Sequence, residues 1–404
     1  MNFDVIIIGA STSGLHAAQK LASSGRKVAV FDRQKELRPA RRTLIVTPAM
    51  RKLLGGLPAD ILLHRTGTMI LSSPEYAASV ELQDPDWIVE RAALIQRLLS
   101  RAQEAGAEIF LGCRFRSFEE AEGGTRHAPT VGVHFQNSRR HKVAWARDAV
   151  IGADGINSDV AEAAEIPTPI SVPIVQAEVA LPPNWDPNVT QVWFEPEATR
   201  FFYWLIPESA ERGVVGLVGD EGVQTQKRLR AFLNRHGLEA EAYQGARVAL
   251  HHPRLKTWGK IGNIPLLMVG DAAGQVKITT VGGLVTGIEA AEAAARSIIN
   301  GTTYKAELRV LKRELDLHWL IRLLLDRLDI RGYDLLVSAV SSRLQGFLSR
   351  HNRDSMAPVI WQLPFVEPKL LKVAFQCLRG KGAMGWVRSA PAEPTLTQVT
   401  KPGS

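Results

Sequence analysis

The sequence predicts an α/β protein: a Rossmann-like domain of parallel strands and helices, an inserted antiparallel β-sheet domain, and a helical C-terminal region. Three observations predict this order. Residues 3–32 read as a strand, a glycine-rich turn, a helix and a second strand. Residues 165–255 change to clustered prolines and short alternating runs, which are typical of an antiparallel sheet. Residues 305–375 are amphipathic and helical.

The expected domains follow these changes of pattern, and one domain is discontinuous because the chain returns at residue 256 to its first pattern. The predicted parts are residues 1–165 and 256–300 for the Rossmann-like domain, with 60–90 as a candidate contribution to the substrate side, 166–255 for the inserted sheet, 301–388 for the helical region, and 389–404 for a flexible tail.

The first strand is residues 3–8, a short apolar run expected to be buried on both faces. Gly9 permits a sharp turn after it, and Gly14 lets the next helix pack close to the strand. We expect that helix over 14–24, ended by Gly25.

The turn and the acid that follows it predict a dinucleotide site. Residues 27–31 form a second apolar strand closed by Asp32, whose carboxylate can accept hydrogen bonds from a ribose. A 2′-phosphate would clash with that carboxylate, which excludes NADP. Ser11 takes the place of the usual middle glycine, and its small side chain can turn aside or bond a phosphate oxygen. Ser13 and Arg33 complete the contacts predicted here; an α/β turn without a ligand is the alternative.

The middle of the chain supplies further elements in order. Residues 38–47 form a loop that becomes apolar, Arg91 opens an amphipathic helix, residues 108–111 form a strand, and 119–130 form a polar hairpin loop. The inserted sheet is predicted from four runs and one helix, namely strands at 175–180, 191–194, 201–206 and 214–218 and a helix at 223–236. A buried strand then ends at Gly270-Asp271, and an alanine-rich helix follows over 284–300.

Composition narrows the class of protein. The 404 residues are 45% hydrophobic and 22% charged, which is ordinary for a soluble globular protein. Cys113 and Cys377 are too few and too far apart for a disulfide framework or a zinc site, which fits a reducing, cytoplasmic compartment. We expect no metal, no secretory signal and no membrane span. The net charge of +8 favours peripheral contact with a membrane over nucleic acid binding, because no nucleic-acid module is recognisable.

Three separated motifs stand in a fixed order along the chain. They are the turn from Gly9 to Gly14 with Asp32, then Gly152-Ala153-Asp154-Gly155, then Gly270-Asp271-Ala272-Ala273-Gly274. In order and spacing they resemble the FAD-dependent oxidoreductases of the para-hydroxybenzoate hydroxylase structural class, over nearly the whole chain. The resemblance implies that FAD is the cofactor and that the first turn and Asp32 hold its ADP half.

The same resemblance implies positions for the rest of the cofactor. These are Asp154 and Gly155 near the pyrophosphate, Asp271 at the ribityl region, Gly282, Gly283 and Leu284 against the isoalloxazine, Arg42, Thr43 and Arg91 on the flavin side, and the backbone of Phe115 at the adenine. The alanine-rich helix would direct its N-terminus at the reduced ring, where its dipole favours negative charge.

Residues 270–283 resemble, more narrowly, the geranylgeranyl reductases, whose pattern reads G-D-A-A-G-x-V-K-P-T-T-G-G-G. Ile278 replaces the proline and Val281 replaces a glycine. Residues 202–216 resemble the aromatic-x-Trp motif that lines the isoprenoid tunnel of those reductases, which implies Trp204, Tyr203 and Trp193 as pocket residues. The chain departs from the archaeal type at residues 40–43, which read ARRT where a Cys-Gly-Gly segment stands.

The resemblance implies a reductase that saturates C=C bonds of an isoprenoid or other apolar substrate, such as a prenyl lipid, by hydride transfer from flavin. Catalytic residues stay unassigned: Arg41, Arg42, Lys277 and Glu195 are candidates for proton donor only in the loosest sense. Arg41 and Arg42 could instead bind a diphosphate or a lipid headgroup. NAD(P)H, a ferredoxin or a reduced flavin carrier could donate the electrons.

Two other functions stay open. Residues 202–207 are close to the Trp-x-Trp-x-Ile-Pro run of flavin-dependent halogenases, so an oxygen-using monooxygenase or halogenase is one alternative. Halogenases also need a tunnel lysine, and Lys52 has no supporting context. The other alternative is a non-redox flavoprotein that assists an isomerisation or cyclisation, as in lycopene-cyclase-like relatives.

Overall fold

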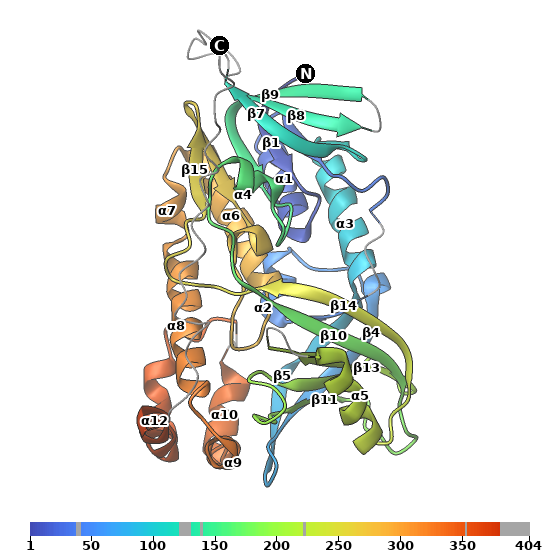
Figure 1. Ribbon diagram of the computed structural model, residues 1–404, viewed down its shortest axis with the longest axis vertical. Helices are drawn as coiled ribbons and strands as arrows, with labels where there is room; N and C mark the ends of the chain where they lie inside the picture. The colour runs from blue at the N-terminus through green and yellow to red at the C-terminus, as the bar shows by residue number, and fades with distance from the viewer. Residues whose placement is uncertain (38–41, 121–130, 138–139, 221–223, 352–353, 380–404) are drawn as a thin grey trace, which may run out of the picture.

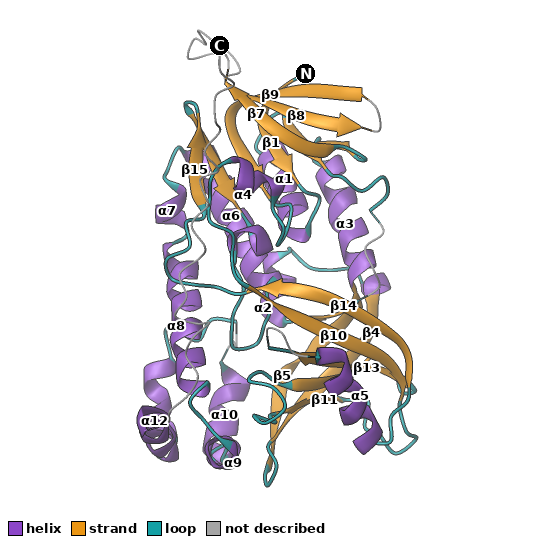
Figure 2. Cartoon of the chain, in the orientation of Figure 1, coloured by secondary structure: helices purple, strands orange, loops and turns teal. Residues whose placement is uncertain are grey.

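The computed structural model describes residues 1–37, 42–120, 131–137, 140–220, 224–351 and 354–379. Two β-sheets follow one another along the long axis of the molecule, and helices line one side (Figure 1). The first sheet lies at the end that carries the N-terminus, and the second lies at the opposite end beside the C-terminal helices (Figures 1 and 2).

The first sheet has a parallel centre with antiparallel additions. Its strands are β1 (Asn2–Ile8), β2 (Val28–Phe31), β6 (Glu108–Phe110), β7 (Arg114–Glu120), β8 (Val131–Asn137), β9 (Arg140–Gly152), β15 (Trp258–Ile261) and β16 (Ile264–Met268). The main path runs β15-β16-β9-β1-β2-β6, and β7 and β8 extend from β9. The pairs from β16 to β6 are all parallel, so the carboxyl ends of these strands meet at one edge.

Helices cover one face of this sheet, as the apolar strands require. They include α1 (Thr12–Ser23), α3 (Arg91–Glu104) and α6 (Leu284–Asn300). Their apolar sides form one core with alternate residues of β1 and β2, such as Val5, Ile7 and Val30. The intervening residues Ile6 and Phe31 face a second core on the other side, roofed in part by β7, β8 and α4 (Asp159–Ala163).

The second sheet draws on two distant parts of the chain. Its strands are β3 (Thr43–Val46), β4 (Leu62–Ser72), β5 (Ala77–Glu90), β10 (Ser171–Ala180), β11 (Val189–Trp193), β12 (Tyr203–Pro207), β13 (Arg212–Val218) and β14 (Ala240–Ala249). Their order is β14-β10-β13-β12-β11-β4-β5-β3. The strands of the inserted segment pair antiparallel with one another, as predicted, and the one parallel pair among the described strands of this sheet, β11–β4, joins the segment to an earlier part of the chain. The pairing arises because residues 62–90 join the sheet as a hairpin beside β11.

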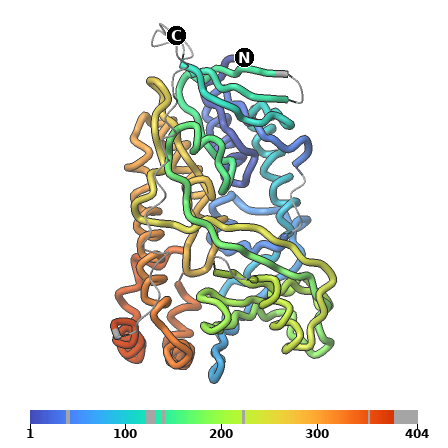
Figure 3. The backbone as a smooth tube through the Cα atoms, viewed as in Figure 1, coloured from blue at the N-terminus to red at the C-terminus, as the bar shows by residue number. Residues whose placement is uncertain are grey.

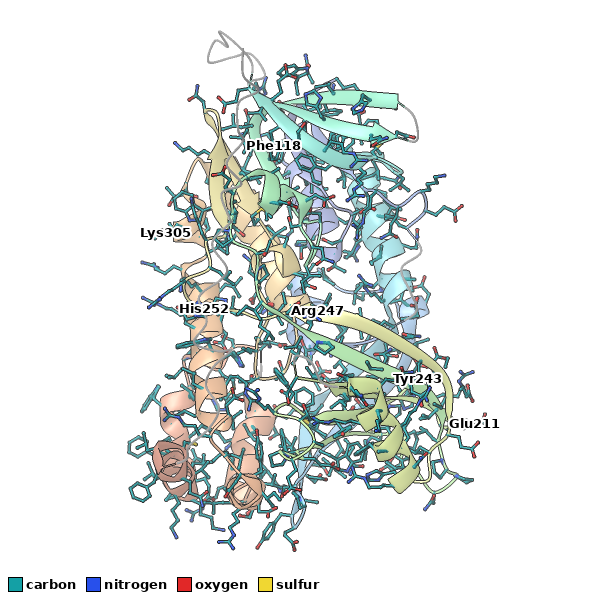
Figure 4. All side chains as sticks on the ribbon, in the orientation of Figure 1. Phe118, Glu211, Tyr243, Arg247, His252 and Lys305 are labelled. Atoms are coloured by element: carbon teal, nitrogen blue, oxygen red, sulfur yellow. The ribbon has the colours of Figure 1, made fainter. Side chains whose placement is uncertain are left out.

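One helix, α5 (Thr225–Arg235), covers the outer face of this sheet. Strand β14 lies in the inserted segment but was not predicted, because its residues alternate weakly between apolar and polar. It crosses the molecule with β10 toward the first sheet (Figure 3), and its Arg247, labelled in Figure 4, donates to the Ser171 hydroxyl at 2.7 Å.

The C-terminal region is helical, as predicted. Its helices are α7 (Tyr304–Glu307), α8 (Arg309–Leu325), α9 (Ile330–Ser338), α10 (Ser342–Arg350), α11 (Leu363–Val366) and α12 (Lys369–Arg379). Helix α8 runs along the side of the molecule and links both ends (Figure 1). His252, labelled beside it in Figure 4, packs edge-on against Trp319 with ring centroids 5.8 Å apart.

Candidate functional site

The first turn is closed so tightly that its glycines have no room for a side chain. Gly9 has φ of 106°, and a Cβ there would lie 2.3 Å from the Ala153 carbonyl oxygen. A Cβ at Gly14 would lie 2.1 Å from the Gly9 carbonyl oxygen. The turn therefore brings β1, α1 and the end of β9 into backbone contact at the carboxyl edge of the sheet, where α/β proteins bind nucleotides.

Ser11 and Asp32 hold this turn in shape. Ser11 is the N-cap of α1, and its hydroxyl accepts from the Gly14 amide at 3.2 Å. The Asp32 carboxylate accepts from the amides of Ala10 and Gln34, both at 2.7 Å. Asp32 thus stands beside the turn at the end of β2, where a ribose contact was predicted, whereas Arg33 points into solvent.

Ser13 lies where three elements converge. Its hydroxyl is 2.5 Å from the position of a Cβ on Gly287 and 2.9 Å from one on Gly270. Ser13 is buried, so α1 packs directly on α6 and on the turn that opens η2 (Gly270–Ala273). The sequence singled out Ser13 for the cofactor but gave no signal for Gly287, because a glycine inside a helix becomes informative only when the neighbouring helix is known.

Asp154 organises the sheet edge. Its Oδ1 accepts from the Ser158 hydroxyl at 2.6 Å and its Oδ2 from the Val160 amide at 3.2 Å. Burial raises the pKa of Asp154 to about 6, although these hydrogen bonds oppose the rise. Gly155 follows with φ of 86° and open space around it. Phe115 has its ring in the core beside Phe118, so only its backbone is left for a ligand.

Arg42, Arg91 and Asp271 form a half-buried charge cluster between the two sheets. Burial lowers the pKa of both arginines, and the positive charge of Arg91 lowers the pKa of Arg42 further. The carboxylate of Asp271 raises the pKa of both arginines and so opposes the effect of burial. Burial raises the pKa of Asp271 against the pull of the two guanidinium groups. The backbone ties the arginines together, because the Arg91 amide donates to the Arg42 carbonyl at 2.9 Å. Glu90, the N-cap of α3, adds a second carboxylate beside Arg91, so the two guanidinium groups face two acidic groups.

The N-terminus of α6 is the other polar feature of this site. Gly283 is its N-cap and no side chain caps it, so its first amides are available to a ligand. A Cβ on Gly283 would lie 3.2 Å from Asp271 Oδ1, which brings the helix start next to the charge cluster. Leu284 is the first helical residue and Gly282 precedes the cap. The Thr43 hydroxyl donates to the Glu208 carboxylate, so a cofactor contact of Thr43 stays a prediction for the rest of the residue.

The loop before α6 contains a strained residue. Val281 has φ of 54°, a left-handed conformation that β-branched residues avoid. The loop is a tight turn in which the Val281 amide donates to the Lys277 carbonyl at 2.7 Å and the Lys277 amide to the Gly282 carbonyl at 3.1 Å. The strain stands at the position where the geranylgeranyl reductase pattern has glycine.

Replacing Val281 with glycine should therefore stabilise the protein by about 1 kcal/mol, because relief of left-handed strain exceeds the cost of a more flexible unfolded chain. Glu165, exposed at the end of α4 with φ of 52°, provides the control. Urea unfolding of Val281→Gly and Glu165→Gly should show gains of the same sign. A loss at Val281 with a gain at Glu165 would mean that packing of the isopropyl group outweighs its strain.

Buried polar contacts anchor the loop before α6 to other parts of the chain. Lys277 Nζ lies 2.5 Å from Asp354 Oδ1, both side chains are 6% exposed, and Thr47 donates to the other Asp354 oxygen. The Thr279 hydroxyl bonds His318 Nδ1, tying the loop to α8. Asp354 lies 77 residues from Lys277 and 307 from Thr47, so spacing along the chain gave no signal for this anchor.

Glu289 on α6 faces the same anchor. The pKa of Glu289 is raised to about 7, chiefly by burial. The positive charge of Lys277 opposes this rise, whereas the negative charges of Asp354 and Glu314 add to it. Because the folded state holds this proton more tightly than the unfolded chain, wild-type stability should fall as pH rises from about 4.5 to about 7. Glu289→Gln should remove that decline and gain roughly 1–3 kcal/mol at the upper end. Urea unfolding across this pH range measures it; parallel curves for the two proteins would contradict it.

An apolar wall lies on the inner face of the second sheet. Trp204 of β12 lies flat on Gly216 of β13, where a Cβ would be 1.9 Å from the indole Cζ2. Trp204 belongs to one cluster with Phe202, Ile278 and Val281, so the α6 loop packs against this wall. Gly216 is a further residue of the site, required by the width of the indole.

The prediction that Tyr203 and Trp193 share a pocket with Trp204 is wrong. These two residues are a cross-strand pair on the opposite face of the sheet. Tyr203 stacks on Phe232 of α5 with centroids 4.2 Å apart, and Trp193 packs edge-on against the same ring at 5.1 Å. Successive residues of a strand face opposite sides, so Tyr203 cannot share the face of Trp204.

The residues present suit an extended dinucleotide whose other end carries a flavin. The glycine turn and Asp32 suit the ADP half, and the uncapped start of α6, next to the charge cluster, suits a ring that becomes anionic on reduction. Among the described residues, no group of three or more histidine, cysteine or acidic side chains could hold a metal ion. Arg41 lies outside the described residues.

Comparison with known proteins identifies the class. The FAD binding domain family matches residues 2–313, so the chain belongs to this family and FAD is its cofactor. The protein is an FAD-dependent oxidoreductase of the geranylgeranyl reductase-like kind, as the resemblance implied.

Particular relatives agree with this class. The chain is 29% identical over 326 residues to digeranylgeranylglycerophospholipid reductase 2 of Methanopyrus kandleri, covering 74% of this chain and 78% of that protein. It is similar in fold to a geranylgeranyl bacteriochlorophyll reductase-like protein from Thermoplasma acidophilum, with TM-score 0.76, 17% identity, and 92% and 99% of the two chains covered. A flavin-dependent brominase has TM-score 0.66 and 14% identity, covering 90% and 98%.

Proposed function

We propose that this enzyme saturates C=C bonds of a prenyl-type lipid by hydride transfer from its flavin. The observation that carries the proposal is the cluster in which Trp204 of β12 and Phe202, just before that strand, meet Ile278 and Val281 of the loop before α6. A long hydrocarbon needs an apolar surface next to the flavin. This cluster is such a surface, and it lies beside the start of α6, which suits the flavin ring. Similarity to digeranylgeranylglycerophospholipid reductases supports the same substrate class.

The residues divide the work between holding the cofactor and holding the substrate. The first turn, Asp32 and Asp271 with its two arginines would hold FAD, and reduced FAD supplies a hydride to a carbon placed against it. Gly282, where a Cβ would come near only the Thr280 hydroxyl at 3.3 Å, would let a flat ring approach the backbone, whereas Gly283 is a glycine because Val276 packs against it. The apolar wall would orient the chain and exclude water, so that the reacting carbon stays in place.

The reaction can be tested under anaerobic conditions. Photoreduced enzyme is mixed with a polyprenyl glycerophospholipid dispersed in detergent, and reoxidation of the flavin is followed by absorbance. We expect reoxidation without oxygen and a product heavier by two hydrogens per bond. Product that forms only with oxygen would support a monooxygenase or halogenase, and turnover without a change in flavin redox state would support a cyclase or isomerase.

Two variants locate the substrate surface. Trp204→Phe should slow reoxidation by the lipid about tenfold while the bound flavin keeps its spectrum, because part of the wall is lost. Tyr203→Phe is the matched control, since the neighbouring ring faces α5 and should leave the rate unchanged. Equal effects of the two changes would place the substrate elsewhere.

A flavin-dependent halogenase is the second candidate, favoured by the run of residues 202–207 and by the brominase-like fold. Lys52, the lysine considered for it, lies exposed on α2 (Pro48–Leu53), away from the enclosed position that a tunnel lysine occupies. Incubation with oxygen, bromide and an electron-rich aromatic substrate tests it by the mass of the product.

A further inference from the structure

A group of large apolar side chains faces solvent near the end of the described chain. Five of the twelve exposed large apolar side chains among the described residues fall within residues 361–378. We call them the α11–α12 face; they are Trp361 (64% exposed), Phe365 (80%), Leu371 (57%), Phe375 (52%) and Leu378 (71%). Helix α11 packs against α10 and α12, and α9, α10 and α12 gather at one end of the molecule (Figures 1 and 2).

Helix α12 has two apolar sides, and only one of them packs into a core among the described residues. Val373 and Cys377 are buried with Leu328 and Tyr333 in a small core against α8 and α9. Leu371 and Leu378 belong to the other side, with Phe375 between them at helical spacing. A helix that only completes a core needs one apolar stripe and a polar outer face, so the second stripe has another use.

The charged residues in this part of the sequence are mostly basic. Residues 340–379 contain six lysine and arginine residues and two acidic residues. Both acids are withdrawn from the surface, since Asp354 is 6% exposed and Glu367 is 7% exposed. Lys369 and Lys372 on α12 are exposed. A partner that covers the apolar stripe would therefore meet positive charge at its edge.

We propose that the α11–α12 face docks on an anionic lipid surface. Aromatic and leucine side chains with lysines beside them are what a helix needs to lie in the boundary between headgroups and acyl chains. No helix among the described residues is long and apolar enough to cross a bilayer, so the contact is one of lying on the surface. Docking of this kind is independent of which bond the enzyme reduces.

Vesicle binding by the full-length, FAD-loaded protein tests this directly. Sedimentation with vesicles of phosphatidylcholine is compared with sedimentation with equal parts of phosphatidylcholine and phosphatidylglycerol. We expect binding to the anionic vesicles that weakens as salt is raised, because the lysines act through a screened potential. Absence of binding to anionic vesicles at low salt would overturn the proposal, and the detergent assay for lipid reduction would be unaffected.

Variants separate the two contributions. Phe365→Ser combined with Leu371→Ser should weaken binding at least about tenfold, because two apolar anchors are lost. Lys369→Gln combined with Lys372→Gln should weaken it by roughly fivefold per lysine on anionic vesicles alone. Val310→Ser is the control, since Val310 is 73% exposed on α8 outside this face and should have no effect. Thermal unfolding checks that every variant is folded.

A single label identifies what covers the face in solution. Ala374 is exposed on α12, and the two native cysteines are buried, so Ala374→Cys accepts a polarity-sensitive fluorophore at one site. We expect emission typical of water in free protein and a blue shift on anionic vesicles. A blue shift already present without vesicles would overturn the proposal: one independent of protein concentration would assign the face to residues 380–404, and one that grows with concentration would assign it to a second copy.

Discussion

Replacing Gly14 with alanine should abolish FAD binding and cost about 3 kcal/mol or more of stability. The added Cβ would stand 2.1 Å from the Gly9 carbonyl oxygen, and no rotamer change can separate them, because the backbone fixes the position of both atoms. The start of α1 would have to move away from β1, which opens the site predicted for the pyrophosphate. Absorbance at the flavin band of the purified protein, with urea unfolding, measures both effects.

Two controls separate the clash from other consequences of changing this helix. Gly25→Ala introduces a side chain at the other end of α1, where φ is 84° but no atom lies within 4 Å, so it should cost about 1–2 kcal/mol and leave the protein yellow. Ser11→Gly removes the N-cap hydroxyl and should cost only a few tenths of a kcal/mol. A yellow Gly14→Ala protein would show that this turn does not hold the cofactor.

Replacing Lys277 with methionine should destabilise the protein by about 3–5 kcal/mol, because it leaves the buried Asp354 carboxylate without its cation. The loop before α6 would lose its anchor, so FAD affinity should fall as well. Unfolding by urea, with and without added FAD, distinguishes the two losses, since the ligand adds stability only to a folded protein that still binds it.

The matched variant removes both charges. Lys277→Met with Asp354→Leu should recover most of the lost stability, because a buried ion pair can often be replaced by apolar residues at little net cost. If the double variant is as unstable as the single one, the Thr47 contact to Asp354 rather than the ion pair is what stabilises the loop.

The elements around the predicted cofactor site were the most predictable from sequence. Local spacing was enough to single out Gly9, Gly14 and Asp32, because the turn, the helix start and the strand end lie within one short stretch of sequence. Helix α3 begins at Arg91 and α6 at Leu284, close to where the apolar periodicity placed them. The domain boundaries and the cofactor contacts of individual residues stay predictions.

The faces of the second sheet could not be predicted in the same way. Strand β12 is buried at all five residues, so it has none of the alternation that distinguishes one face from the other. Tyr203 and Trp204 were therefore assigned together although they face opposite sides. Asp354 was missed for a different reason: its partners Lys277 and Thr47 come from distant segments, and an isolated acid in a basic region carries no local signature.

The second sheet is built from two distant parts of the chain, and this has a consequence for folding during synthesis. On the ribosome, β3, β4 and β5 emerge long before β11, the strand that pairs with β4. The first sheet is completed even later, because β16, which pairs with β9, is synthesised after β11. The second sheet is complete only when β14 has been made and the first only when β16 has been made, so we expect the nascent chain to expose unpaired strand edges until about residue 268 has left the exit tunnel.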